Sequence, residues 1–200
     1  MKTYDREYFQ RWYHDRDTRI LMSGSLERKV RLAVAAAEFV LGRRIRSALD
    51  VGCGEGLWRA RLRALRPGLR YTGVDGSAYA VRRHGRRRNI LLARFGELGR
   101  LELDGPFDLV VCSDVLHYVP TSELAHGIRA LGRHTQGLAW IEVFTATDET
   151  MGDHVEYHER PTRTYERLFA AAGLTPIGLY AFVPRDVRRT LTAFERGGRK

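Results

Sequence analysis

The sequence has few of the features that would place the chain in a membrane or a secreted scaffold. None of its apolar runs reaches the roughly 18 residues that a membrane span needs. The segment Met1–Arg19 is charged and aromatic, and it has no apolar core of the kind that a signal peptide carries. Two cysteines, Cys53 and Cys112, are too few for a disulfide framework. We therefore expect a cytoplasmic protein with no membrane partner.

Lysine is also scarce, because all but three of the 34 basic residues are arginine. The formal net charge is +10, and such a charge can indicate a nucleic-acid partner. A choice of arginine this lopsided can equally reflect the codon bias of a genome, and most of these arginines are spread along the chain. One cluster stands out, and it keeps nucleic acid open as a less favoured partner: Arg82, Arg83, Arg86, Arg87 and Arg88.

The remaining composition indicates one folded domain over residues 1–200. The chain is 44% hydrophobic and 29% charged, and it contains no repeat and no linker. We expect N-terminal helices in residues 1–44 and an α/β core in residues 45–200. The aromatic residues of Tyr4–Tyr13 share neighbouring helical faces, which fits either a helix packed on the domain or a lid that closes over a ligand. A second helix is predicted over Ser25–Val40, with Ser25 as its cap.

After residue 45, strand and helix signals alternate. Strands are predicted over 47–51, 70–74, 90–93, 107–113, 138–144, 174–182 and 190–194. Helices are predicted over 58–65, 77–84, 122–131 and 163–172. Strict alternation indicates an α/β fold, a doubly wound and mostly parallel seven-stranded sheet of Rossmann-like type with N-terminal helices.

Three alternating glycines follow the first predicted strand, at Gly52, Gly54 and Gly56. Glycine allows a positive φ and lets a ligand approach the backbone closely. A dinucleotide loop would place its third glycine at position 57, which is leucine here. Asp50, just before the loop, does not suit a pyrophosphate but suits a ligand that carries an ammonium group.

Three linked motifs resemble the class I S-adenosylmethionine-dependent methyltransferases, in that family's order and spacing. They are Leu49–Gly56, then Gly73–Ser77, then Phe107–Val110 running into Asp114–Val119, and together they span roughly residues 45–145. The resemblance implies S-adenosyl-L-methionine as the cofactor. It also implies a small-molecule acceptor that is methylated on oxygen or nitrogen, with an RNA or protein acceptor as the alternative.

The resemblance implies roles for the residues of the first two motifs. Asp50 would organise the amino group of the cofactor's methionine part, through the loop and water. Gly52, Cys53 and Gly54 form the loop that would wrap the cofactor. Asp75 would accept hydrogen bonds from both ribose hydroxyls.

Further positions around the cofactor are implied in the same way. Four residues would lie beside the adenine: Gly76, Ser77, Gly96 and Glu97. Glu97 stands where the family usually has aspartate, so its carboxylate would reach the adenine amino group with one methylene more. Ser113 and Asp114 would flank the sulfonium and the methyl group being transferred.

His117 and Tyr118 are the candidate catalytic residues, because the family often places groups that face the acceptor after this strand. His117 would act either as a general base or as a residue that packs against the cofactor or caps the turn. Residues 113–116 read Ser-Asp-Val-Leu in place of the Asn/Asp-Pro-Pro-Tyr/Phe tetrad of enzymes that methylate exocyclic nucleic-acid amines. The chain also lacks a Pro-Cys pair, which argues against 5-methylcytosine chemistry.

The segment Asp148–Arg160 is rich in polar residues. His154, Glu156 and His158 alternate, so an extended chain would place them on one face. Three interpretations remain open: a metal site, a polar loop facing the acceptor, and a solvated loop. Our set of expected site residues includes no metal ligand.

Overall fold

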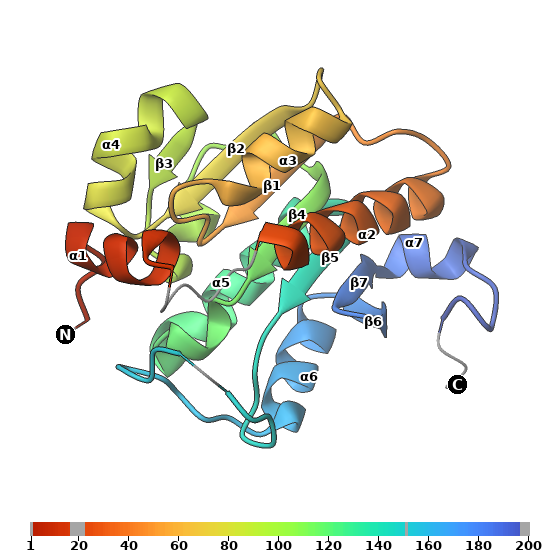
Figure 1. Cartoon of the computed structure of the whole chain (residues 1–200). Helices are drawn as coiled ribbons and strands as arrows, with labels where there is room; N and C mark the ends of the chain where they lie inside the picture. The colour runs from red at the N-terminus through yellow and green to blue at the C-terminus, as the bar shows by residue number, and fades with distance from the viewer. Residues whose placement is uncertain (1, 17–22, 151, 197–200) are drawn as a thin grey trace.

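The computed structural model describes residues 2–16, 23–150 and 152–196 and has an α/β architecture (Figure 1). Residues 1, 17–22, 151 and 197–200 lie outside the described residues. The strands are β1 (Ser47–Val51), β2 (Arg70–Asp75), β3 (Ile90–Leu92), β4 (Phe107–Ser113), β5 (Thr135–Glu142), β6 (Leu174–Gly178) and β7 (Ala181–Pro184). They form one seven-stranded sheet in the order β3-β2-β1-β4-β5-β7-β6.

Strand direction in this sheet is mixed. The strands β1 to β5 pair with one another in parallel, as expected. In contrast, β7 runs antiparallel to both β5 and β6. The prediction of a Rossmann-like α/β sheet of seven strands is confirmed. The description as mostly parallel holds for β1 to β5 and fails at the edge formed by β7 and β6.

Helices cover both faces of the sheet. The helices are α1 (Arg6–Phe9), α2 (Ser23–Leu41), α3 (Leu57–Leu65), α4 (Ala78–Arg88), α5 (Thr121–His134), α6 (Thr162–Ala171) and α7 (Arg185–Thr190). A π-helical turn, Gln10–His14, continues α1, and 3₁₀ turns occupy Phe95–Arg100 and Leu116–Tyr118. One buried cluster joins α2 and α3 to the sheet, and another joins α5 and α6 to its opposite face.

β4 lies at the centre of this arrangement. Its residues Leu109 and Val111 pack with α2 and α3, while Val110 and Cys112 pack in the cluster on the opposite face. Both sets are fully buried. An apolar run such as Leu109–Cys112 is what a strand covered on both faces requires, and the predicted strand 107–113 is confirmed.

The closing part of the sheet differs from the expected one. The segment predicted as one strand over 174–182 is broken by a tight turn at Leu179 and Tyr180, whose φ angles are 49° and 65°. Two positive φ angles are what a two-residue hairpin needs, so β6 and β7 form the closing pair by themselves. The predicted strand 190–194 is wrong. Residues 185–190 form α7, and Phe194 is 97% exposed with no strand beside it.

The helix boundaries near the N-terminus also shift. α2 begins at Ser23, so Ser25 lies within its first turn and is not its cap. The Tyr4–Tyr13 segment is helical as expected, as α1 followed by the π-helical turn. Figure 1 places α1 beside the lower end of α4, at the opposite end of the sheet from α7. Among the helices of the described ranges, none is long and apolar enough to cross a membrane.

Candidate active site

The glycine loop after β1 forms a tight backbone turn at the carboxyl edge of the sheet. Gly52 and Gly54 have φ angles of 72° and 53°, in the left-handed region that side chains disfavour. A Cβ added at Gly52 would lie 2.3 Å from Val115 Cγ2, so this position also needs glycine for space. The backbone N–H groups of Gly52 and Cys53 donate to Val74 O at 2.8 and 3.2 Å, which anchors the loop on β2.

Asp75, the last residue of β2, is held by the loop that it supports. Its Oδ2 accepts from the Gly54 N–H at 2.7 Å, and its Oδ1 accepts from the Ser77 N–H at 2.8 Å. Burial raises the pKa of Asp75, and these two hydrogen bonds act in the opposite direction. A carboxylate has about four acceptor positions, so both oxygens can still accept further hydrogen bonds.

Asp50 lies behind the loop in a buried polar pair. Its Oδ2 accepts from the Tyr71 hydroxyl at 2.7 Å, and the residue is 2% exposed. Burial, followed by the nearby charge of Asp75, raises the pKa of Asp50 to about 7, while the Tyr71 hydrogen bond opposes the shift. Burial also raises the pKa of the neighbouring Cys53 thiol, which makes it a poor nucleophile.

Ser77 caps α4 as predicted, because its Oγ accepts from the Ala80 N–H at 3.1 Å. The same hydroxyl donates to Tyr4 O at 2.6 Å. Gly76 lies between this cap and Asp75. The N-terminal segment therefore touches the expected adenine side of the site directly.

The aromatic residues of the N-terminal segment lie over the glycine loop. A Cβ placed on Gly54 would meet Tyr13 Oη at 2.5 Å and Phe9 Cε1 at 3.2 Å. Phe9 is 2% exposed and stacks on Tyr79 of α4, with 5.8 Å between ring centroids. The segment is further fixed by His14, whose Nε2 lies 3.1 Å from Glu55 Oε2. These rings form an aromatic cover on the loop.

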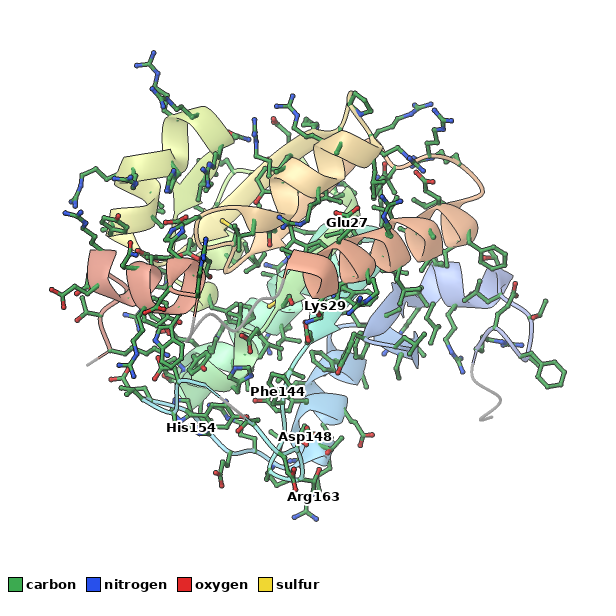
Figure 2. The ribbon with its side chains drawn as sticks, viewed as in Figure 1. Glu27, Lys29, Phe144, Asp148, His154 and Arg163 are labelled. Carbon is green, nitrogen blue, oxygen red and sulfur yellow. The ribbon has the colours of Figure 1, made fainter. Side chains whose placement is uncertain are left out.

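A second polar group forms where β4 and β5 end. Ser113 Oγ donates to Glu142 Oε2 at 2.6 Å, and Lys29 Nζ donates to Oε1 at the same distance. Figure 2 shows Lys29 on the side of α2 that faces the end of β5. The Asp114 N–H donates to Glu142 O at 3.0 Å. Asp114 has a φ of 63°, a strained conformation for a residue with a side chain, and it aims the carboxylate at this edge.

His117 is completely buried, and both of its ring nitrogens face protein atoms. The Phe144 N–H donates to its Nδ1 at 3.5 Å. Nε2 lies 3.1 Å from Asp114 Oδ1. The ring also packs on Tyr118 and Tyr157, at centroid distances of 4.4 and 4.8 Å. This environment favours the packing interpretation of His117 over that of a base that meets the acceptor.

Residues 152–160 fold back against the end of β4. Tyr118 Oη donates to Asp153 O at 2.7 Å, and the His158 N–H donates to His117 O at 2.8 Å. Arg160 is 7% exposed and donates to Val119 O at 2.7 Å. Two of these polar contacts between the loop and the end of β4 are thus made by buried residues of the loop, Asp153 and Arg160.

The three alternating residues of this loop do not come together. His154 and Glu156 are exposed, and Figure 2 shows His154 in the loop on the same side of the molecule as α1. Within 2–16, 23–150 and 152–196, no group of three or more His, Cys, Asp or Glu side chains could hold a metal ion.

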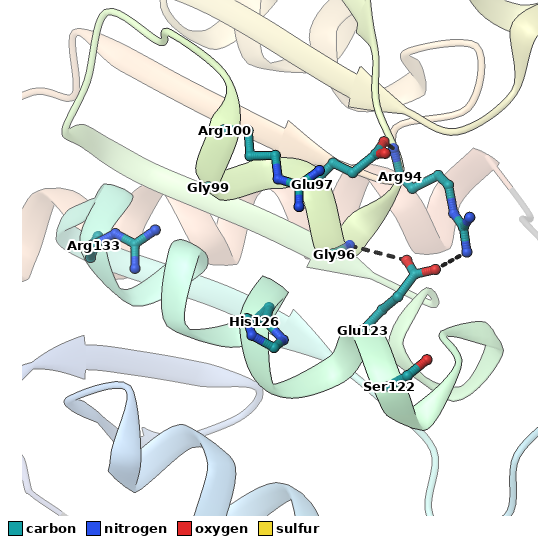
Figure 3. A pocket seen from close by; sticks show the side chains of 9 residues that line it. All are labelled: Arg94, Gly96, Glu97, Gly99, Arg100, Ser122, Glu123, His126 and Arg133. Carbon is teal, nitrogen blue, oxygen red and sulfur yellow. Dashed lines mark hydrogen bonds and ion pairs between the residues drawn. The ribbon is translucent and has the colours of Figure 1, made fainter.

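Gly96 and Glu97 lie in a 3₁₀ turn beside α5 rather than in the two groups above. Glu97 Oε2 accepts from the Arg94 N–H at 3.0 Å and so caps its own turn. The Gly96 N–H donates to Glu123 Oε2 at 3.2 Å. Figure 3 shows these residues lining a surface pocket, where the Arg94 guanidinium also pairs with Glu123. The adenine contact expected of Glu97 would compete with this cap.

The predicted residues thus form two connected groups at one edge of the sheet. Asp50, Gly52, Gly54, Asp75 and Ser77 are linked through the loop, and Ser113, Asp114, His117 and Tyr118 are linked through Glu142 and Asp153. The contact between Gly52 and Val115 joins the two groups. We name them the loop half and the strand-end half.

Sequence reasoning missed several residues of this site. Glu142 could have been identified from the sequence, since it is the only charged residue in the apolar run 138–143, which begins within β5. Tyr71 and Lys2 had none, because their roles depend on partners far away in the sequence.

Similarity to known proteins is found at two levels, in the sequence and in the fold. Residues 49–136 match the family model described as "Methyltransferase domain". A search of curated protein sequences finds no match.

Solved structures share the fold at low sequence identity. The sugar N-methyltransferase KedS8 from Streptoalloteichus sp ATCC 53650 superposes with a TM-score of 0.63 at 21% identity, covering 92% of this chain and 93% of that one. The 1,6-didemethyltoxoflavin-N1-methyltransferase of Burkholderia thailandensis, solved with 1,6-didemethyltoxoflavin and S-adenosylhomocysteine, gives 0.56 at 23% identity, covering 86% and 76%.

An O-methyltransferase family protein from Burkholderia thailandensis gives a TM-score of 0.52 at 19% identity, covering 76% of this chain. The chain spans about half of that protein, 53% of its length. At these identities the likeness establishes the fold.

Proposed function

Since residues 49–136 match a family model described as a methyltransferase domain, we propose that the protein is an S-adenosylmethionine-dependent methyltransferase that methylates a small molecule on oxygen or nitrogen. The observation that carries the proposal is Asp75 at the end of β2. Its two carboxylate oxygens accept from the Gly54 and Ser77 N–H groups. A carboxylate fixed at this place by the glycine loop suits the two ribose hydroxyls of a nucleoside.

The loop half fits S-adenosylmethionine. Gly52 and Gly54 present backbone without side chains, and Asp50 supplies a buried carboxylate behind the loop. Phe9 and Tyr13 lie over Gly54, and Tyr4 O takes the Ser77 hydroxyl. The N-terminal segment must therefore shift to admit the cofactor, which favours a lid over a permanently packed helix.

When bound, S-adenosylmethionine supplies an electrophilic methyl group on a sulfonium. The chain contributes position and exclusion of water. Ser113 and Asp114 are held by Glu142 at the point where the loop half and the strand-end half meet. Tyr118 and the aromatic residues of the N-terminal segment would supply the walls that enclose the bound cofactor and acceptor.

An enclosed site supports a small acceptor. Two structurally similar proteins are described as a sugar N-methyltransferase, KedS8, and as a 1,6-didemethyltoxoflavin-N1-methyltransferase. An RNA or protein acceptor remains the alternative function, because Arg82, Arg83, Arg86 and Arg87 are exposed on α4. Neither acceptor class follows from the fold alone.

Calorimetric titration with S-adenosylhomocysteine tests the proposal. We expect binding in the micromolar range and no comparable binding of NAD, because position 57 is leucine in place of the third dinucleotide-loop glycine. Absence of S-adenosylhomocysteine binding at millimolar concentration would refute the function. Hydrogen exchange on the same samples should show the backbone of α1 changing its protection when the cofactor binds.

A further inference from the structure

The ammonium group of Lys2 is enclosed by aromatic rings and a carboxylate. Its Nζ lies 3.5 Å from the centroid of the Tyr118 ring, and 5.1 and 5.3 Å from those of Tyr4 and Tyr8. Asp153 Oδ2 lies 2.7 Å from the same atom, and the Lys2 and Asp153 side chains are 4% and 8% exposed. Ring faces attract cations, most strongly where water is excluded. We call these four partners of Lys2 the amine cage.

Two partners in the amine cage, Tyr118 and Asp153, lie outside the N-terminal segment and are held by contacts of their own. Tyr118 follows β4, and its hydroxyl donates to Asp153 O at 2.7 Å. Asp153 Oδ1 accepts from the Val155 N–H at 2.9 Å. These contacts hold the ring and the carboxylate in place independently of Lys2. Burial alone would raise the pKa of Asp153, but its hydrogen bonds to Lys2 and to the Val155 N–H lower it, so this carboxyl keeps its negative charge when a cation lies beside it.

The amine cage adjoins the strand-end half. Tyr118 packs on His117, whose Nε2 lies 3.1 Å from Asp114 Oδ1. The charges of Asp114 and Glu156 also act on the Lys2 ammonium. The surroundings of this ammonium are therefore negative and aromatic, beside the residues expected to flank the transferred methyl group.

Lys2 belongs to the same segment as Phe9 and Tyr13, which cover Gly54. A shift of this segment that admits the cofactor also withdraws the Lys2 ammonium. That shift leaves Tyr118 and Asp153 without their cation, and the buried carboxylate then favours a replacement of the same charge.

We propose, on the basis of the proposed methyltransferase function, that the acceptor is a small amine whose nitrogen takes the place now filled by the Lys2 ammonium, between Tyr118 and Asp153. Lys2 is then a tethered stand-in for the substrate. A neutral alcohol at this place would leave the Asp153 charge uncompensated, so the amine cage selects nitrogen over oxygen.

Methylation of such an amine needs only the loss of one proton and the transfer of the methyl group from sulfur to nitrogen. The amine arrives protonated and gives up one proton, to a neighbouring carboxylate or to water. Its nitrogen lone pair then forms the bond to the methyl carbon, as the carbon–sulfur bond breaks and its electron pair stays on sulfur. Burial lowers the pKa of Lys2 against the pull of Asp153, Asp114 and Glu156, and the same burial would help a bound amine to lose its proton.

The test uses the full chain with Lys2→Ala, which removes both the charge and the bulk of the side chain and so frees the place between Tyr118 and Asp153. The probes are n-butylamine, which reproduces the end of a lysine side chain, and n-butanol as its neutral counterpart. Binding is measured by calorimetry with S-adenosylhomocysteine present and absent. We expect Lys2→Ala to bind n-butylamine at least about tenfold more tightly than n-butanol, which corresponds to about 1.4 kcal/mol. The wild type should bind the amine more weakly than Lys2→Ala, because Lys2 competes.

The matched control is Lys2→Ala combined with Asp153→Asn, in which the preference for the amine should disappear. Lys2→Ser serves as a second variant if Lys2→Ala does not fold. Equal affinity for the two probes, or no n-butylamine binding up to about 20 mM, overturns the amine assignment. A preference that survives Asp153→Asn also overturns it.

The S-adenosylhomocysteine titration of the same samples separates this inference from the function on which it rests. Cofactor binding without amine preference refutes the acceptor assignment alone. Amine preference without cofactor binding refutes the methyltransferase function, and with it the role of the amine as acceptor.

Discussion

The loop half and the strand-end half are built in different ways. The loop half uses mainly backbone atoms from two adjacent parallel strands, and its key residues lie within Asp50–Ser77. The strand-end half uses side chains from distant segments, among them Lys29, Asp114, Glu142 and Asp153. A backbone cradle suits a ligand that is common to many enzymes, whereas a side-chain cage can be altered residue by residue to suit one acceptor.

The largest expected effect lies in the loop half. Asp75→Ala should weaken S-adenosylhomocysteine binding by about 1.5–3 kcal/mol, or roughly 10–150-fold, because hydrogen bonds to a charged group are lost. Calorimetry measures the change. Asp104→Ala, at a side chain that is 95% exposed, is the control and should bind normally. Wild-type affinity in Asp75→Ala would place the ribose elsewhere.

The next effect should separate the two halves. Deleting residues 2–16 removes the aromatic cover and Lys2 but leaves Gly54 and Asp75 in place. Turnover should fall by at least about tenfold, because water enters the site, while cofactor affinity should not fall, since no segment then has to shift to admit the cofactor. Methyl-transfer rates with a labelled donor and calorimetry on the same protein provide the two numbers. Full turnover in the truncated chain would mean that the cover is ordinary packing.

A smaller effect is expected from the titration of the Asp50 carboxyl in the loop half. The pKa of Asp50 is raised to about 7 by burial and by the charge of Asp75, so the folded protein holds a proton that an unfolded carboxyl would have lost. Stability should therefore decrease as pH rises from about 4 to about 7. A cofactor amino group nearby would lower this pKa and release up to about one proton on binding near pH 6.5.

Calorimetry in two buffers of different ionisation enthalpy counts the released protons. Asp50→Asn should abolish the release and flatten the dependence of stability on pH. Proton release that persists in Asp50→Asn would assign the titration to another group.

The smallest expected effect is on α4, outside both halves. Arg88 donates to Glu55 O and supports the glycine loop, so the substitutions spare it. Replacing Arg83, Arg86 and Arg87 with glutamine should leave turnover on a small acceptor unchanged. Salt-sensitive RNA binding that disappears in this variant would instead favour the polymer alternative.

Much of the loop half could be predicted from the sequence. Its glycines, Asp75 and the cap Ser77 are neighbours in the chain, and local backbone rules place them at one edge of a parallel sheet. The central strand was predictable for the same reason, since Leu109–Cys112 is an apolar run that suits a strand covered on both faces.

The strand-end half was predictable only in part. Lys2 and Asp153 are 151 positions apart, and nothing local in either segment indicates the other. His117 and Tyr118 could be located, but the burial of His117 depends on Phe144 and Tyr157, which reach it through tertiary packing. The strand predicted over 190–194 failed because alternation alone cannot reveal that no partner strand is present.

The N-terminal segment touches both halves at once, through Tyr4 on Ser77 and Lys2 on Asp153. An element fixed at two points over two binding places uncovers them in the same movement. We therefore expect donor and acceptor to exchange during one opening event, with spent donor and methylated product departing together.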